Sequence, residues 1–249
     1  IKKKKEIKMK INLSVIIPVY EAQKTLLRTI NSINNQLIAD KALKIEIILI
    51  IDDGKKYNKF LPKLKNNFYL RIIKTNGIKT GPGNARNQGI DKAKGKYIGF
   101  LDADLSTDFA DFNDLTKTIS STDYKIVSGS RINRMGASII KQSSRGIISK
   151  TVNLIIRKIL GMEFQDTQCG AKVMTRDVID ATFQKPFMTK WLFDVEIFLR
   201  MKKHFGVDNV QGLICEQPLK RWVHEDGSKL SMKDSIKILG QLLRIAVKY

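Results

Sequence analysis

Short apolar runs in the first half of the chain limit the fold more than any other feature of the sequence. They span residues 13–20, 45–51, 69–73 and 97–101 and are rich in Val and Ile. Apolar β-branched runs of this length, without alternating polar residues, are typical of strands that are buried on both faces. The runs therefore predict strands of a largely buried sheet.

Segments with helical spacing alternate with these runs. Residues 22–38 repeat apolar side chains at helical intervals, a lysine-rich helical stretch follows Gly54, and another helix is expected to begin near Asn84. Alternation of apolar strands with helices is typical of α/β proteins. We therefore expect a mainly parallel sheet with helices on both faces.

The second half of the chain is less regular. Residues 126–131 predict one more strand, and residues 147–160, 187–201 and 231–248 predict helices. The last of these helices is amphipathic and carries Lys and Arg on its polar side. Such a helix can lie in a membrane interface or pack on a core, and the sequence leaves both open.

The chain is strongly basic. Its 249 residues hold 45 Lys and Arg against 24 Asp and Glu, which gives a formal net charge of +21. Such a chain is expected to bind polyanions, namely nucleic acid, an anionic lipid surface or phosphorylated small molecules. An aromatic strand motif, paired Cys and His spacing and a helix-turn-helix pattern are all lacking, so no nucleic-acid partner is expected.

We expect one catalytic domain with basic ends. Residues 1–12 would form a basic N-terminal arm, residues 13–230 the catalytic domain and residues 231–249 a C-terminal basic amphipathic helix. No apolar run is long enough to span a bilayer. Because the sequence begins at Ile1 rather than Met, we expect a fragment whose anchoring segment is missing. The few cysteines favour a reducing compartment.

Acidic residues follow two of the predicted strands. Asp52 and Asp53 come after the second run, and Asp102 and Asp104 come after the fourth. Ligands of parallel sheets bind at the carboxyl ends of the strands. Two neighbouring carboxylates repel each other, and a hard divalent cation relieves that repulsion. Asp102 and Asp104 therefore predict a site for Mg²⁺ or Mn²⁺, with a helix-capping turn as the structural alternative.

Short motifs occur along the chain in a fixed order. They are Pro18–Glu21, Ile51–Gly54, Gly81–Asn87, Asp102–Asp104, Gly129–Arg131, Arg145–Ser149, Asp166–Lys172, Trp191–Glu196 and Gly227–Lys229. This ordered set resembles the family-two glycosyltransferases of the GT-A fold. The later motifs are similar to the subgroup that acts on polyprenyl phosphates, above all the dolichyl-phosphate β-glucosyltransferases. The resemblance covers residues 13–230 and implies a Rossmann-like GT-A sheet.

The resemblance implies a role for each matching position. Metal ligands would be Asp102 and Asp104. The groups that receive the acceptor phosphate would be Arg131, Arg145 and Ser149. Catalytic groups would be Asp104, Arg131, Asp166 and Asp194. Groups that bind the nucleotide sugar would be Pro18, Tyr20, Glu21, Asp52, Gly83, Arg86, Asp102 and Lys229.

The sequence also departs from the family pattern at three places. Residues 55–57 replace a stretch that is usually rich in Ser and Thr, which bears on the nucleotide loop. Ala171 stands where an aromatic residue is common, which bears on the fit of the acceptor. Ser106 stands where mannose synthases tend to carry Gln, which bears on the choice of donor.

The predicted activity is metal-dependent, inverting transfer of a hexose from a nucleotide sugar to a polyprenyl or dolichyl phosphate. Glucose and a UDP-sugar are favoured. A phosphate acceptor is already largely dianionic near neutral pH and needs no general base. A saccharide hydroxyl would need one, and Asp166, Asp194 or Glu196 could serve; this alternative stays open.

The expected location is the cytoplasmic face of a membrane, where the basic ends would meet anionic lipid. The protein would be peripheral there, or anchored by a segment absent from this chain. A nucleic-acid-binding protein is the alternative that is not an enzyme, and it predicts a steeply salt-dependent affinity for DNA or RNA.

Overall fold

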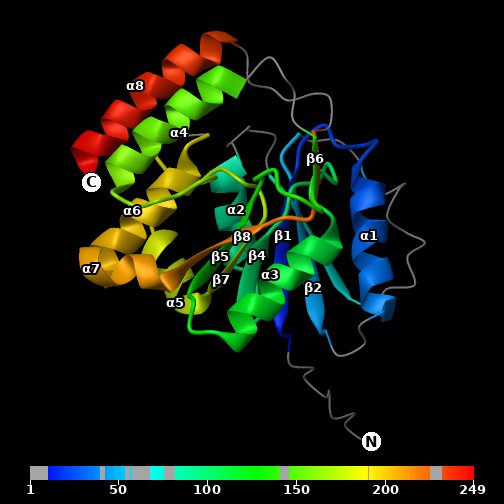
Figure 1. Cartoon of the computed structure of the whole chain (residues 1–249). Coiled ribbons are helices and arrows are strands. Elements are labelled where there is room, and N and C mark those ends of the chain that lie inside the picture. The colour runs from blue at the N-terminus through cyan, green and yellow to red at the C-terminus, as the bar shows by residue number, and fades with distance from the viewer. Residues whose placement is uncertain are drawn as a thin grey trace, which may run out of the picture.

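The computed structural model describes residues 11–39, 43–53, 57, 68–75, 82–140, 146–189, 191–224 and 232–249. Figure 1 shows its elements. The strands are β1 (Leu13–Val19), β2 (Ile45–Ile51), β3 (Tyr69–Lys74), β4 (Tyr97–Phe100), β5 (Ile126–Ser130), β6 (Ser138–Ile140), β7 (Lys172–Thr175), β8 (Ile214–Pro218) and β9 (Arg221–Val223). The helices are α1 (Leu26–Ala39), α2 (Pro82–Ile90), α3 (Phe109–Ser121), α4 (Gly146–Leu160), α5 (Arg176–Thr182), α6 (Phe193–Phe205), α7 (Val207–Val210) and α8 (Met232–Lys248), with a 3-10 turn at Gln211–Leu213.

A mixed sheet forms the centre of the described part of the chain. Its strand order is β3-β2-β1-β4-β7-β5-β8. Neighbouring strands run parallel except at β7, which is antiparallel to both β4 and β5. Strands β6 and β9 pair separately as a short parallel ribbon. The predicted α/β fold with a mainly parallel sheet is confirmed, and β7 is an insertion that the strand-and-helix alternation did not predict.

One face of the sheet packs against α1 and α3. Odd-numbered residues of β1 and β2 point to this face, and the apolar stripes of the two helices cover them. Both faces of the central strands are therefore buried, which is why their sequences are apolar without alternation. Residues of this core include Leu13, Val15, Ile30, Ile33, Ile47, Leu49, Phe109 and Phe112.

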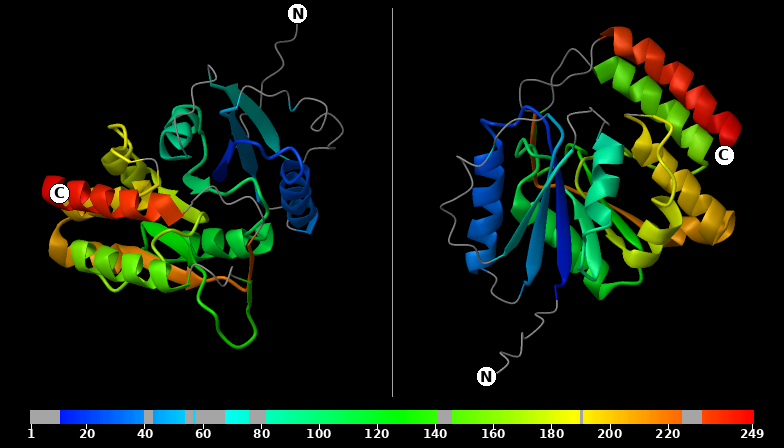
Figure 2. Two further views of the ribbon diagram at one scale, coloured as in Figure 1. Left: turned by 90° about the horizontal axis from the view of Figure 1, so that it is seen from above. Right: turned by 180° about the vertical axis from the view of Figure 1, so that it is seen from behind.

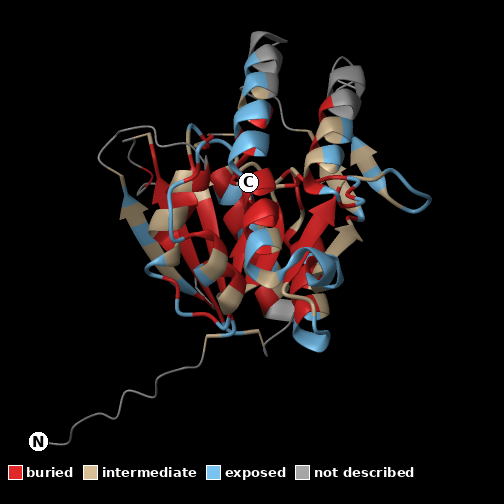
Figure 3. Cartoon of the chain, turned by 90° about the vertical axis from the view of Figure 1, so that its left-hand side faces the viewer, coloured by how far each residue is buried: buried red, intermediate tan, exposed pale blue. Residues whose placement is uncertain are grey.

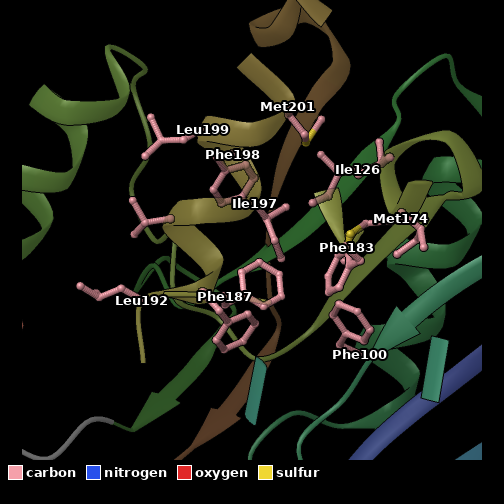
Figure 4. Packing of buried hydrophobic residues seen from close by; sticks show 14 of the residues in the cluster. Phe100, Ile126, Met174, Phe183, Phe187, Leu192, Ile197, Phe198, Leu199 and Met201 are labelled. Atoms are coloured by element: carbon pink, nitrogen blue, oxygen red, sulfur yellow. The ribbon is translucent and has the colours of Figure 1, made fainter. Parts of the chain in front are cut away.

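The other face packs against α2, α4, α5, α6 and α8 (Figures 1 and 2). Figure 4 shows aromatic rings at the centre of this layer. The ring centroids of Phe100 and Phe183 lie 5.4 Å apart, and those of Phe183 and Phe187 lie 5.1 Å apart. Both pairs meet edge to face, the arrangement that aromatic quadrupoles favour. This layer holds α6 firmly against the sheet.

Helices α4 and α8 lie side by side and extend beyond the end of the sheet (Figure 3). Leu242 and Ile245 of α8 are buried in the second core, whereas Leu243 and Val247 are exposed. The apolar residues of α8 therefore pack on the core in part and face outward in part. Within the described ranges, no helix is long and apolar enough to cross a membrane.

Two predicted helices begin later than the sequence pattern indicated. The helix expected over 187–201 begins only at Phe193, because the carboxylate of Glu196 accepts the N–H groups of Met188 and Thr189 and fixes the preceding segment as a turn. The helix expected from residue 22 begins at Leu26. The lysine-rich stretch after Gly54 lies outside the described residues except for Tyr57.

Candidate active site

The carboxyl ends of β1, β2, β4 and β5 meet at one edge of the sheet. Because β7 runs antiparallel, its first residue, Lys172, reaches the same edge and pairs with Phe100 of β4 and Ser128 of β5. The loops that leave this edge, together with the first two turns of α2, carry the predicted site residues from Tyr20 to Arg131. An edge of this kind is the usual ligand site of an open parallel sheet.

The turn after β1 is held by an aspartate that follows β2. The Asp53 carboxylate accepts the N–H of Glu21 at 2.8 Å and the hydroxyl of Tyr57 at 2.6 Å. The Tyr57 hydroxyl oxygen in turn accepts the N–H of Ala22 at 3.3 Å. Glu21 has a φ of 51°, which few residues other than glycine adopt. The contacts of Asp53 therefore fix a strained turn at a candidate site.

The neighbouring carboxylate, that of Asp52, is buried. It accepts the hydroxyl of Thr75 at 2.9 Å, and the Asp52 N–H donates to the carbonyl of Val19 at 3.0 Å. Asp52 thus joins the ends of β1 and β2 to the residue that follows β3. The two carboxylates therefore have different partners: Asp53 binds the turn after β1, and Asp52 binds the residue after β3.

Asp102 and Asp104 lie close enough to repel each other. Burial and the charge of Asp102 together raise the pKa of the Asp104 carboxyl above its ordinary value. Asp104 accepts the N–H of Ser106 at 2.9 Å across a turn in which Leu105 has a φ of 60°. Asp102 is held from the other side by Arg86, whose Nη2 lies 3.0 Å from its Oδ1.

This acidic pair fits a divalent cation. Mg²⁺ and similar hard cations are commonly held by one or two carboxylates, with phosphate oxygens and water completing the shell. The pKa of Asp104 is raised first by burial and then by the charge of Asp102, and a bound cation would offset both effects. The candidate ligands are these two carboxylates only: neither here nor elsewhere in the described ranges do His, Cys, Asp and Glu side chains form a group of three that could hold a metal ion.

Arg131, directly after β5, donates three hydrogen bonds to Asp166. The Asp166 carboxylate accepts the backbone N–H of Arg131 at 2.9 Å, its Nε at 2.6 Å and its Nη2 at 2.7 Å. The guanidinium lies over the ring of Trp222, 5.2 Å from its centroid. Burial alone would raise the pKa of Asp166, but the hydrogen bonds and charge of Arg131 outweigh it and lower that pKa.

Asp194, in the first turn of α6, is paired with Lys172. The Lys172 Nζ lies 2.8 Å from the Asp194 Oδ1, and both side chains are almost fully buried. Burial raises the pKa of Asp194, and the charges of Lys172 and Arg86 oppose that rise. Glu196 is also buried, but it binds Arg200 and the turn before α6, so it takes part in the packing of that turn rather than in the site.

Arg86 of α2 connects the acidic pair to the aromatic layer. Its guanidinium lies 4.9 Å from the ring centroid of Phe193 and 5.3 Å from that of Phe100. A Cβ at Gly83, one helical turn earlier, would lie 2.8 Å from the Cβ of Phe193. Gly83 therefore allows α2 to approach α6 closely enough for Arg86 to reach Asp102.

The structure brings most of the predicted residues together. Asp102 lies within electrostatic range of both Arg131 and Asp194, so these three charged groups belong to one cluster. Arg145 and Lys229 lie outside the described residues, as does the side chain of Ser149, so these positions remain predictions.

Sequence reasoning did not assign several residues that shape this site. Asp53 could have been found, because it is adjacent to Asp52 and shares its place after a strand. Lys172 and Gly170 follow Asp166 within a recognised motif, but their importance depends on where β7 lies. The other residues that it missed are Tyr57 and Trp222.

Three curated relatives of this chain carry the same name. The chain is 32% identical to a dolichyl-phosphate beta-glucosyltransferase of Dictyostelium discoideum, over 96% of this chain and 75% of that protein. It is 32% identical to the protein of the same name from Saccharomyces cerevisiae, over 95% and 75%. The human protein of that name is 28% identical, over 88% and 69%.

Solved structures with the same fold are more distant in sequence. Mannosyl-3-phosphoglycerate synthase from Rubrobacter xylanophilus superposes with a TM-score of 0.73 at 14% identity, over 96% of this chain and 73% of that chain. Glucosyl-3-phosphoglycerate synthase from Mycobacterium tuberculosis, in a complex with Mn²⁺, UDP-glucose and phosphoglyceric acid, superposes with a TM-score of 0.68 at 13% identity, over 95% and 80%. Likeness at this level of identity concerns the fold, which is of the GT-A kind.

The match to a protein family covers most of the chain. Residues 14–183 match the family described as Glycosyl transferase family 2. This span includes β1 to β7 and the residues from Glu21 to Lys172 that form the edge described above. The chain therefore belongs to glycosyl transferase family 2 and is a glycosyltransferase.

Proposed function

We propose that this enzyme transfers glucose from UDP-glucose to a polyprenyl or dolichyl phosphate, with inversion at the anomeric carbon. The observation that carries the proposal is the proximity of a metal-type acidic pair, Asp102 and Asp104, to the arginine held by Asp166. A diphosphate leaving group and a phosphate acceptor need these two kinds of group side by side.

The donor side is supported by the carboxylates at the edge of the sheet. Asp102 and Asp104 would hold Mg²⁺ or Mn²⁺ at the donor diphosphate. The cation supplies positive charge to the leaving group as the glycosidic bond breaks. Arg86 orients Asp102 for this role through its hydrogen bond of 3.0 Å. The turn of Pro18, Tyr20 and Glu21, together with Asp52, would receive the base and ribose.

The choice of donor rests on the relatives. The curated relatives described above are named as glucosyltransferases, and one structural neighbour was crystallised with UDP-glucose and Mn²⁺. Because the chain covers most of the length of these relatives, the same donor is the simplest assignment. Lys229, which lies outside the described residues, would close over the phosphates.

A phosphate acceptor fits the state of the carboxylates better than a sugar hydroxyl does. Asp166 is engaged by Arg131 and has a lowered pKa, so it is a weak base. Asp194 is almost fully buried and its Oδ1 is paired with the Lys172 ammonium, so that oxygen is already engaged. A phosphate needs neither residue as a base, because its second pKa is about 6. Asp166 and Asp194 would orient cations instead.

Arg131 would receive the acceptor. Asp166 occupies its Nε and Nη2, which leaves Nη1 outside this pair. A guanidinium fixed in this way is preorganised for phosphate, since its planar fork binds two oxygens at defined angles. Arg145 and Ser149 would complete the phosphate site. The dianion would then attack the anomeric carbon from the face opposite the diphosphate, which inverts the configuration in one displacement.

We also propose that the enzyme works at an anionic membrane surface on its cytoplasmic side. Helices α4 and α8 would lie on the membrane surface. Their exposed apolar residues, Leu154, Leu243 and Val247, would enter the lipid, and Arg244 and Lys248 of α8 would meet its anionic head groups. Sedimentation with vesicles of phosphatidylcholine and phosphatidylserine tests this location. We expect binding that requires the anionic lipid and weakens as salt is added.

The activity is tested by incubating the protein with labelled UDP-glucose, polyprenyl phosphate and Mn²⁺. We expect a labelled lipid product, no product with EDTA, and none from Asp104→Asn. Transfer to free saccharides but not to the lipid would establish the hydroxyl acceptor instead. Salt-sensitive binding of DNA or RNA, with no transfer from any common nucleotide sugar, would favour the alternative that is not an enzyme.

A further inference from the structure

Lys172 is the first residue of β7, and its ammonium lies beneath the candidate site. Its side chain is 1% exposed. A lysine buried this deeply is rare, because removing an ammonium from water is unfavourable unless the group is paired and hydrogen-bonded. The burial of Lys172 is therefore better explained by the groups that its ammonium contacts than by the packing of the sheet.

Two contacts of the Lys172 ammonium point in different directions. Its Nζ lies 2.8 Å from the Asp194 Oδ1 on α6 and 2.5 Å from the carbonyl oxygen of Cys169. The second contact fixes the peptide that leads into Gly170. A Cβ at Gly170 would lie 1.8 Å from the Asp102 Oδ2, so this peptide is packed directly against the proposed metal ligand.

The ammonium also acts on the acceptor side of the site. Its charge contributes to the lowering of the pKa of Asp166, the residue that grips Arg131. Asp194 in turn lies in the field of Arg86 and Asp102. The charged groups therefore alternate in sign through the site: Arg131, Asp166, Lys172, Asp194, Arg86 and Asp102.

We infer that Lys172 is a positioning residue for both halves of the proposed reaction, because it fixes the Cys169–Gly170 peptide against Asp102 and supplies the cation shared by Asp194 and Asp166. This inference rests on the proposed function. Without the ammonium, Asp194 would compete with Asp102 for Arg86, and the peptide under Asp102 would lose its tether.

A positioning role of Lys172 can be distinguished from a purely structural role in the ion pair with Asp194. A structural pair would act only through Asp194, so removing both partners would remove the effect of Lys172. The contact between Lys172 and the Cys169 carbonyl does not involve Asp194 and would survive in Asp194→Asn. The comparison that matters is therefore between Asp194→Asn and the double variant that also carries Lys172→Met.

The experiment uses the full chain in four forms besides the native protein: Lys172→Met, Asp194→Asn, the double variant and the control Lys125→Met. Lys125 pairs with Asp177 but is partly exposed and lies at the other end of β5. For each we would measure the thermal midpoint, the affinity for Mn²⁺ in the presence of UDP, and kcat and KM for transfer to polyprenyl phosphate.

We expect the double variant to bind Mn²⁺ at least about 10-fold more weakly than Asp194→Asn, and to have a kcat lower by about 10–100-fold, the usual effect of removing a group that orients a metal ligand. Asp194→Asn leaves the buried Lys172 ammonium without its carboxylate, whereas the double variant removes both charges, so the thermal midpoint of the double variant should be no lower than that of Asp194→Asn even though it binds Mn²⁺ more weakly. Lys125→Met should keep native Mn²⁺ affinity and kcat.

Equal Mn²⁺ affinity and equal kcat in Asp194→Asn and the double variant would overturn the inference, because Lys172 would then act through Asp194 alone. This pair of variants decides the question even if Lys172→Met by itself does not fold. Failure of the proposed function looks different: the native protein would bind Mn²⁺ and UDP but transfer no glucose, and the Mn²⁺ comparison would still decide the role of Lys172.

Discussion

Gly170 lies so close to Asp102 that no side chain fits between them. A Cβ at this position would lie 1.8 Å from the Oδ2, 2.5 Å from the Cγ and 2.9 Å from the Oδ1 of Asp102. A glycine here lets the chain between Asp166 and β7 pass directly beneath one of the proposed metal ligands. The position of the Asp102 carboxylate is thus set by backbone on one side and by Arg86 on the other.

Gly170→Ala should therefore displace the Asp102 carboxylate and weaken metal binding. We expect the affinity for Mn²⁺ in the presence of UDP to fall by about 10–100-fold, and the rate of transfer to fall with it. Titration calorimetry measures the affinity. Gly212→Ala is the matched control, since a Cβ there would meet no atom within 4 Å. Native Mn²⁺ affinity in Gly170→Ala would contradict the assignment of Asp102 as a ligand.

The importance of Gly170 illustrates what the sequence could and could not predict. Apolar runs predicted β1, β2 and β4 because each is buried on both faces, and the acidic residues after β2 and β4 marked the edge where these strands meet. The run that predicted β3 forms an edge strand instead, and its residues are half-buried or exposed. Those signals are local. The contact between Gly170 and Asp102 depends on β7 entering the sheet antiparallel between β4 and β5, and no pattern within the four residues of β7 specifies its neighbours.

The roles of the buried charged residues could not be predicted from the sequence either. Lys172 looks like any other lysine in a chain that carries many of them, and only its place between Asp194 and the Cys169 carbonyl gives it a role. The same holds for Glu196, which sequence reasoning left as a possible base but which binds Arg200 and the turn before α6. For Lys172 and Glu196, no position after a strand marked their importance, so their roles became clear only from their burial and partners.

Asp104 should lower the stability of the metal-free protein. Burial and the charge of Asp102 raise its pKa, so ionising this carboxyl is less favourable in the folded state than in the unfolded state, and the difference lowers stability at neutral pH. Asp104→Asn keeps an oxygen for the Ser106 N–H and removes the charge. We expect the thermal midpoint of the metal-free variant to rise by a few degrees, since about 1 kcal/mol corresponds to roughly 2–4 °C in a chain of this size.

The same substitution should remove the response to metal. Mn²⁺ with UDP should raise the thermal midpoint of the native protein at neutral pH, by mass action, and leave that of Asp104→Asn unchanged. Because the pKa of Asp104 is raised, protons should compete with Mn²⁺ as the pH falls from about 7 to about 5, where an exposed aspartate would still be ionised. A native response to Mn²⁺ that is equal at both pH values would count against this pair as the metal site.

Asp166 should contribute stability with the opposite dependence on pH. Its pKa is lowered in the folded state, so its contribution is present above the ordinary aspartate pKa of about 3.9 and is lost as the pH falls toward the lower folded value. Asp166→Asn should cost about 3 kcal/mol at neutral pH, because it leaves the Arg131 guanidinium without its anionic partner. Unfolding in urea, measured between about pH 7 and about pH 3, should show the difference narrowing as the pH falls.

Asp177→Asn provides the control for this prediction. Asp177 also pairs with a lysine, Lys125, and its pKa is also lowered, but nearly half of its side chain is exposed to solvent. Solvent screens such a pair, so we expect a loss of at most about 1 kcal/mol. If Asp166→Asn were no more destabilising than Asp177→Asn at neutral pH, the pair of Asp166 with Arg131 would be a surface contact rather than a buried part of the site.

Arg200 should be among the most sensitive positions for stability, although it lies away from the reacting groups. Its guanidinium is almost fully buried and donates to the carbonyl oxygens of Thr182, Lys185 and Pro186. It also pairs with Glu196 at 3.2 Å. Arg200→Met would leave these acceptors unpaired in the layer that supports α6, which should destabilise the fold by about 3–5 kcal/mol.

A second substitution should restore part of the stability that Arg200→Met loses. In Arg200→Met with Glu196→Gln, no uncompensated charge remains, and the single glutamine oxygen can still accept the N–H of either Met188 or Thr189, which bond to different oxygens of Glu196 in the native protein. We expect denaturant unfolding to show the double variant more stable than Arg200→Met, with Lys92→Met, on an exposed turn, within about 0.5 kcal/mol of the native protein. Equal stability of the single and double variants would mean that the three carbonyl contacts, and not the charge of Glu196, account for the effect of Arg200.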